Sequence, residues 1–96
     1  MVTNFLNMKK ELKPKVMAHL KRAEGMLKKV IQMVEEDRYC IDVLQQSAAV
    51  IGFTKSANRL LLQNHLDSCF KAGMMSNSPK KQKEMIDELL QVVSKM

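Results

Sequence analysis

The chain of 96 residues has no tryptophan, three phenylalanines and one tyrosine, and it has only three glycines and two prolines. So few turn-forming residues exclude a β-rich fold with many tight turns. No apolar run is long enough to cross a bilayer or to serve as a signal peptide, so we expect a cytoplasmic protein without membrane association. These absences favour a single all-α domain over residues 1–96.

The usual signatures of catalysis are also absent. The sequence contains no Ser-His-Asp arrangement, no paired carboxylates and no glycine-rich phosphate loop. It also lacks the short turn between two short helices that defines a helix-turn-helix. We therefore expect a protein that is not an enzyme and has no small-molecule substrate. Any contact with DNA would come from basic residues on long helix faces, chiefly to phosphates.

The chain is basic, with 16 lysine and arginine residues against 10 aspartate and glutamate residues. A formal net charge of +6 and an isoelectric point near 9.5 favour an anionic partner, nucleic acid first. A basic surface that is merely solvated is the alternative.

Three helices are predicted, over about 14–37, 40–71 and 79–94. In the first, apolar residues recur at steps of four and three, which is the pattern of a helix with one buried face. Its members are Val16, Leu20, Ala23, Leu27, Val30 and Val34. Pro14 suits the first turn of this helix, and Ser78 followed by Pro79 suits the start of the third.

The second helix is unusually long for a small domain. About 32 uninterrupted residues would span ~48 Å, and Gly73 is expected to end the helix as a left-handed cap. Its apolar residues occupy more than one face, so other helices must cover it from several sides. A single three-helix chain is too small to do so, and oligomerisation is expected.

Cys40, His65 and Cys69 are the candidate chemical site. They include both cysteines and one of the two histidines of the chain. His65 and Cys69 are four residues apart and share a helix face. On one continuous helix, 25 steps of ~100° bring Cys40 to within about 20° of the direction of His65, but roughly 37 Å away along the axis.

The three side chains therefore cannot meet within one chain. An antiparallel helix of a second subunit would bring its His65 and Cys69 beside Cys40, and symmetry would repeat the site at the other end. The spacing thus predicts a dimer with two sites between subunits.

Two thiolates and one imidazole form a soft ligand set. Such ligands favour Cu(I), Zn(II) and Fe–S centres. Structural zinc usually has four protein ligands, so three soft ligands fit three-coordinate Cu(I) better, although Zn(II) with another fourth ligand stays open. Two inert thiols and a histidine with an ordinary structural role are the alternative. Tyr39 is a candidate partner for its neighbour Cys40. Metal-bound histidine normally donates its other N–H, and Glu84, Asp87 and Glu88 are candidates to accept it.

At these residues the chain resembles the copper-sensing repressor family (CsoR/RcnR-like). The segment 33–46, MVEEDRYCIDVLQQ, resembles the family signature around its first ligand. The segment 19–25, HLKRAEG, resembles the basic motif of the first helix, and 65–69, HLDSC, resembles the segment with the other ligands. His19 stands where the family often has arginine.

The resemblance implies an all-α dimer of dimers, each dimer an antiparallel four-helix bundle, that represses transcription from operator DNA. In copper-sensing members, Cu(I) binds Cys40 of one chain and His65 and Cys69 of the other, and DNA is released. Glu88 matches a family glutamate near the site. Lys21, Arg22, Lys55 and Arg59 are the expected DNA contacts, and a homodimer assembling into a homotetramer is the expected state.

Two alternatives stay open. With the same fold, Cys40 and Cys69 would sense persulfide or electrophiles, and His65 would be dispensable. In a different class, the protein would be a copper-binding helical bundle without DNA binding. Members that sense nickel or cobalt carry a further histidine near the N-terminus, and the first twelve residues here contain none.

Overall fold

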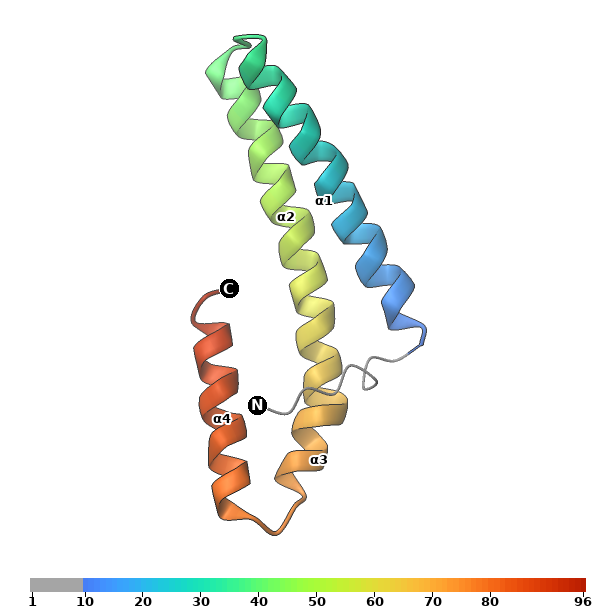
Figure 1. The fold of residues 1–96 in the computed structure, drawn as a ribbon, viewed down its shortest axis with the longest axis vertical. Coiled ribbons are helices and arrows are strands. Elements are labelled where there is room, and N and C mark those ends of the chain that lie inside the picture. Colours follow the sequence, from blue (N-terminus) through green and yellow to red (C-terminus); the bar gives the residue numbers. More distant parts are fainter. Residues whose placement is uncertain (1–9) are drawn as a thin grey trace.

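The computed structural model describes residues 10–96, and in this range it contains helices and no strand. The chain forms α1 (Leu12–Glu35), α2 (Cys40–His65), a π-helix η2 (Leu66–Phe70), α3 (Lys71–Met74) and α4 (Pro79–Val93). The segments from α2 through α3 form one continuous helical rod (Figure 1). The prediction of an all-α fold with three helical segments is confirmed, and each observed boundary lies within three residues of the predicted one.

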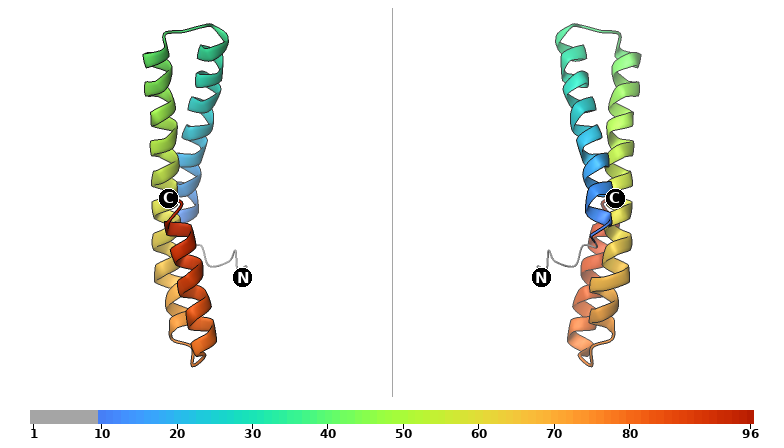
Figure 2. Two further views of the ribbon diagram at one scale, coloured as in Figure 1. Left: turned by 90° about the vertical axis from the view of Figure 1, so that its left-hand side faces the viewer. Right: turned by 90° about the vertical axis from the view of Figure 1, so that its right-hand side faces the viewer.

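Helix α1 packs antiparallel against α2, and the two form a long hairpin (Figures 1 and 2). The buried residues of α1 are Val16, Ala23, Val30 and Met33, which recur at helical spacing on the face toward α2. From α2, Ala57 is completely buried. Small and β-branched side chains at this contact let the two helices approach closely, so a narrow line of residues holds the hairpin together.

A tight turn joins α1 to α2. Asp37 has a φ of 54°, and its N–H donates to the carbonyl oxygen of Val34 at 3.1 Å. The N–H of Arg38 donates to the carbonyl oxygen of Met33 at 3.0 Å. These two bonds form a Schellman motif, with aspartate at the position where glycine is usual. The turn ends α1 and starts α2 at Cys40 within four residues.

The joint between α3 and α4 is held by side chains. Ser78 caps α4, because its Oγ accepts a hydrogen bond from the N–H of Lys81 at 3.3 Å. Gln82 donates through Nε2 to the carbonyl oxygens of Met74 and Ser76, at 3.0 and 2.8 Å. The first bond satisfies the carbonyl of Met74, the last residue of α3, and the second satisfies that of Ser76 in the loop that follows.

The prediction that Gly73 forms a left-handed cap is wrong. No glycine of the described chain has a positive φ, and Gly73 lies within α3. Its role is steric: a Cβ atom at this position would overlap with the sulfur of Met85 on α4. Glycine here leaves room for the end of the Met85 side chain, which would have to move if a Cβ atom were added.

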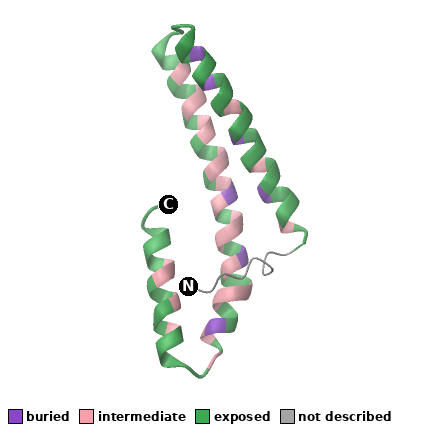
Figure 3. Cartoon of the chain, in the orientation of Figure 1, coloured by how far each residue is buried: buried purple, intermediate pink, exposed green. Residues whose placement is uncertain are grey.

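The protomer is elongated and has a small core. Its radius of gyration is 17.5 Å, against about 12.5 Å for a compact domain of this length. No large side chain in residues 10–96 is fully buried, and most of α4 is exposed (Figure 3). No helix in this part of the chain is long and apolar enough to cross a membrane.

Candidate metal centre and basic surface

Cys40 lies at the tip of the hairpin, where α2 begins. It is exposed and forms no disulfide. Tyr39 is the N-cap residue of α2, and 69% of its surface is exposed. A thiol and a phenol side by side at the surface are available to a second molecule, because neither contributes to the core of the protomer.

His65 and Cys69 lie near the opposite end of the same rod. His65 is the last residue of α2, and Cys69 belongs to η2. Both are half-buried, and the imidazole lies 6.3 Å from the ring of Phe70, measured between centroids. The hydroxyl of Ser68 lies 3.8 Å from Cys69 Sγ. Both candidate ligands therefore have side-chain neighbours within the chain, whereas Cys40 is exposed.

The π-helix gives this pair its alignment. Four α-helical steps overshoot a full turn by about 40°, whereas the i→i+5 pattern of η2 makes a wider turn. His65 and Cys69 thus come closer to lying directly above each other. The Ser68 hydroxyl donates to the carbonyl oxygen of Asn64 at 2.6 Å, which is the acceptor that its own N–H would use in an α-helix.

The helix predicted over about 40–71 covers this segment, but the sequence did not predict that part of it is a π-helix. Its sequence carries no specific signal: Ser68 bonds to the carbonyl four residues before it, but Thr54 and Ser56 do the same within the regular α-helix α2. π-Helical turns are frequent at functional sites.

Within one protomer, the three candidate ligands do not meet. Cys40 and His65 stand at the two ends of α2 (Figure 1), about 37 Å apart along an axis of 25 residues. Residues 10–96 contain no group of three histidine, cysteine or acidic side chains close enough to hold a metal. A site built from all three would require a second copy of the chain.

Glu88 and His65 face the same cavity. Both line a cavity of about 410 Å³ between α2 and α4, together with apolar side chains that include Leu61, Leu62 and Leu89. Helix α4 thus places a carboxylate in the surroundings of the imidazole. Tyr39 is not part of this cavity and stays with Cys40 at the other end of α2.

The four basic residues predicted to contact DNA are all exposed, but they do not form one cluster. Lys21 pairs with Glu24, with 3.6 Å between Nζ and Oε1. The guanidinium carbon of Arg22 lies 5.2 Å from the centroid of the Phe53 ring. Lys55 follows Phe53 by two residues and so points about 160° away from it. Arg59 lies about 120° from Phe53 around the same helix.

The sequence matches the family model for metal-sensitive transcriptional repressors over residues 12–95. The chain belongs to this family. The match covers every helix of the structure, and it includes all three candidate ligands.

Individual relatives agree with this assignment. The copper-sensing transcriptional repressor CsoR of Mycobacterium ulcerans (strain Agy99) is 42% identical over 74 residues, which cover 77% of this chain and 61% of the relative. The CsoR of Mycobacterium tuberculosis (strain ATCC 25618 / H37Rv) is 37% identical over 89 residues, with 90% of this chain and 72% of the relative covered. The chain thus spans less than two thirds of the first of these relatives.

A solved structure shows the same fold. The copper-sensing repressor CsoR with Cu(I) from Geobacillus thermodenitrificans NG80-2 superposes with a TM-score of 0.77 at 29% sequence identity. The superposition covers 99% of this chain and 92% of the other. The elongated helical arrangement is therefore similar to that of a solved copper-sensing repressor.

Proposed function

We propose that this protein is a Cu(I)-responsive transcriptional repressor, active in the cytoplasm, that binds operator DNA without copper and leaves it when Cu(I) is bound. The observation that carries the proposal is the placement of Cys40, His65 and Cys69 at the two ends of one helix, with similar angular directions. The named copper-sensing relatives support the choice of metal. The proposed role is regulatory, and the protein is not an enzyme.

A second subunit completes the proposed site. In an antiparallel dimer, Cys40 of one subunit faces His65 and Cys69 of the other, and the arrangement occurs twice by symmetry. The apolar side chains that one protomer leaves exposed support this assembly. They include Leu20, Leu27, Ile31 and Val34 on α1 and Leu44 and Ile51 on α2. Two such dimers would form the homotetramer.

The donor set fits Cu(I). Both thiols are free, and two thiolates with one imidazole are soft ligands without a fourth cysteine or histidine in the site. Zn(II) would need a further ligand, which is why it is the weaker candidate. Glu88, which lines the same cavity as His65, is proposed to accept a hydrogen bond from the second nitrogen of this histidine, and Tyr39 to donate one near Cys40.

The proposed response is a coupling free energy between two ligands. Bound metal would link the two subunits, through Cys40 of one and His65 and Cys69 of the other. The link would hold the subunits in one relative arrangement, and that arrangement binds DNA less well. A coupling of about 1–3 kcal/mol corresponds to ~5–150-fold in DNA affinity, and DNA must weaken metal binding by the same factor.

Lys21, Arg22, Lys55 and Arg59 are proposed to supply DNA contacts. Contacts of this kind are mainly to phosphates, and each neutralised phosphate steepens the fall of affinity with salt. The placement of Lys55 away from the α1 surface assigns it to a different part of the interface from Arg22.

Thiol sensing is the second candidate function, because Cys40 is exposed and reduced. The substitution His65→Ala separates the two. A copper sensor loses its response or most of its metal affinity, whereas a sensor of persulfide or electrophiles keeps its response.

The test is an anaerobic Cu(I) titration of the reduced protein against a competing chelator, followed by a gel shift with DNA from upstream of its own gene. Tight binding of about one Cu(I) per protomer with release of DNA supports the proposal. Weak copper binding with DNA retained favours the thiol sensor. Copper binding without retardation of any promoter fragment favours the copper-binding bundle. For the Cu(I) titration, His19→Ala is a matched control for His65→Ala, since His19 lies on α1 away from the ligands.

A further inference from the structure

Phe53 is an aromatic side chain on the outer part of the contact between α1 and α2. It is half-buried, and two side chains of α1 pack on it. The guanidinium carbon of Arg22 lies 5.2 Å from its ring centroid. The ring of His19 lies 6.4 Å away, with an angle of 34° between the planes. His19 and Arg22 are three residues apart and hence neighbours on α1.

The contact with Phe53 leaves the hydrogen-bonding edge of Arg22 free. A guanidinium carries five N–H donors in its plane, and packing on an aromatic ring uses its face. Within residues 10–96, no carboxylate forms an ion pair with Arg22. Lys21 differs, because its ammonium already pairs with Glu24 at 3.6 Å. Arg22 therefore lies against an aromatic ring and has no carboxylate partner for its donors within residues 10–96.

Arg22 is the centre of a row of cations. Lys15, Arg22 and Lys29 recur every seven residues along α1, so they lie on one side of the helix about 10 Å apart, and all three are exposed. A second row, Leu20, Leu27 and Val34, lies about 140° further around α1. Its members are 39%, 49% and 59% exposed. If the apolar row meets another subunit, the cationic row remains open.

We propose that Phe53 is a positioning residue for DNA binding: its ring holds the Arg22 guanidinium with the N–H edge turned to a backbone phosphate of duplex DNA. Arg22 is then the main phosphate contact of the cationic row, since a planar fork can bind phosphate through two hydrogen bonds. His19 packs on the same ring and narrows the space in which Arg22 can move. The inference rests on the proposed function, because it concerns the DNA contact of the repressor.

The test is a double-mutant cycle on DNA affinity. Wild-type protein, Phe53→Leu, Arg22→Gln and the double variant are titrated by fluorescence anisotropy against duplex DNA from upstream of the gene, at several salt concentrations. Phe53→Leu is expected to weaken binding by about two- to fivefold for each protomer engaged. It should have no further effect once Arg22 is glutamine.

Two variants and two further readouts separate positioning from folding. Phe53→Tyr keeps the ring and should bind DNA as the wild type does, whereas Arg22→Lys keeps the charge and should lose most of the effect of Arg22. Lys21→Gln is the matched control, with a smaller loss, because Lys21 already has a carboxylate partner. Oligomeric mass and Cu(I) stoichiometry should be unchanged in Phe53→Leu.

An equal loss from Phe53→Leu in both backgrounds would overturn the inference, as would no loss in either. Those results leave the repressor function intact, because the wild type still binds the duplex. If the wild type binds no duplex at any salt concentration, the repressor function and this inference fail together.

Discussion

Gly25 and Gly73 are both helical glycines, but their surroundings are opposite. Nothing lies within 4 Å of a Cβ atom added at Gly25, whereas one added at Gly73 would overlap with the sulfur of Met85. We expect Gly25→Ala to raise the free energy of unfolding by about 0.5–1 kcal/mol, through the better helix propensity of alanine. We expect Gly73→Ala to lower it slightly, by less than about 1 kcal/mol, because the end of the flexible Met85 side chain must move and this cost offsets the same propensity gain.

Urea denaturation followed by circular dichroism, at one fixed protein concentration, measures both effects. The control is Gly73→Ala in a Met85→Ala background, where the space is open and the substitution should become stabilising. A loss of stability of the same size in that background would show that the Met85 contact is not the cause.

For single residues of the candidate site, the sequence predicted only those positions that follow from the geometry of one helix. Cys40 and His65 point in similar directions because a helix turns by a constant angle per residue. Their relative direction therefore depends only on the number of residues between them in one helix. The contact of Phe53 with Arg22 could not be predicted in the same way. It depends on the register between α1 and α2, which only the packing of Ala23, Val30 and Ala57 determines.

At the scale of elements, the joint between α3 and α4 connects the candidate metal ligands to Glu88. Gln82 holds α4 through two hydrogen bonds to carbonyl oxygens at the end of α3. We expect Gln82→Ala to leave DNA affinity without copper unchanged. The copper-dependent loss of DNA affinity should shrink several-fold, because a loosened α4 no longer holds Glu88 at the cavity that His65 also lines.

DNA titrations with and without Cu(I) measure this coupling. Gln91→Ala on the same helix is the matched control, since Gln91 is exposed and α4 keeps its bonds to α3. An undiminished response in Gln82→Ala would mean that the joint does not transmit the signal.

The elements were predictable where local patterns are strong. Ser78 and Pro79 marked the start of α4, and the apolar periodicity marked α1, because capping and amphipathicity are local properties. The turn after α1 carries Asp37 at a positive φ, and the π-helix contains Cys69; neither has a strong local signature. Gly73 was wrongly predicted to be a cap, because the sequence alone does not distinguish a glycine buried within a helix from one that ends it.

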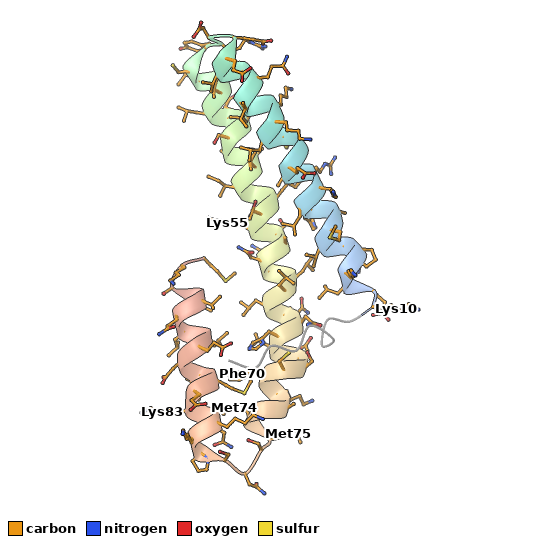
Figure 4. All side chains as sticks on the ribbon, in the orientation of Figure 1. Lys10, Lys55, Phe70, Met74, Met75 and Lys83 are labelled. Carbon is orange, nitrogen blue, oxygen red and sulfur yellow. The ribbon has the colours of Figure 1, made fainter. Side chains whose placement is uncertain are left out.

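At the scale of the whole molecule, the hairpin leaves a large apolar surface uncovered. Figure 4 shows the side chains of the two long helices projecting outward over most of their length, and α4 covers only the lower part of α2 (Figure 2). Leu44 and Ile51 of α2 are 63% and 54% exposed. Apolar exposure on this scale marks an interaction surface. The same surface carries Cys40, so assembly and formation of the metal site are one event in the proposed dimer.

This linkage makes a complementation test decisive. Cys40→Ala removes one ligand from both sites of a homodimer, and the double variant His65→Ala, Cys69→Ala removes the other two. Neither homodimer should bind Cu(I) tightly. In a mixed dimer, Cys40 of the double-variant chain faces His65 and Cys69 of the other chain, so one complete site returns. Copurification of two differently tagged chains isolates assemblies that contain both, and Cu(I) titration should show restored binding at up to about half the wild-type stoichiometry. A site formed within one subunit would instead remain incomplete in both chains, and mixing would restore no copper binding.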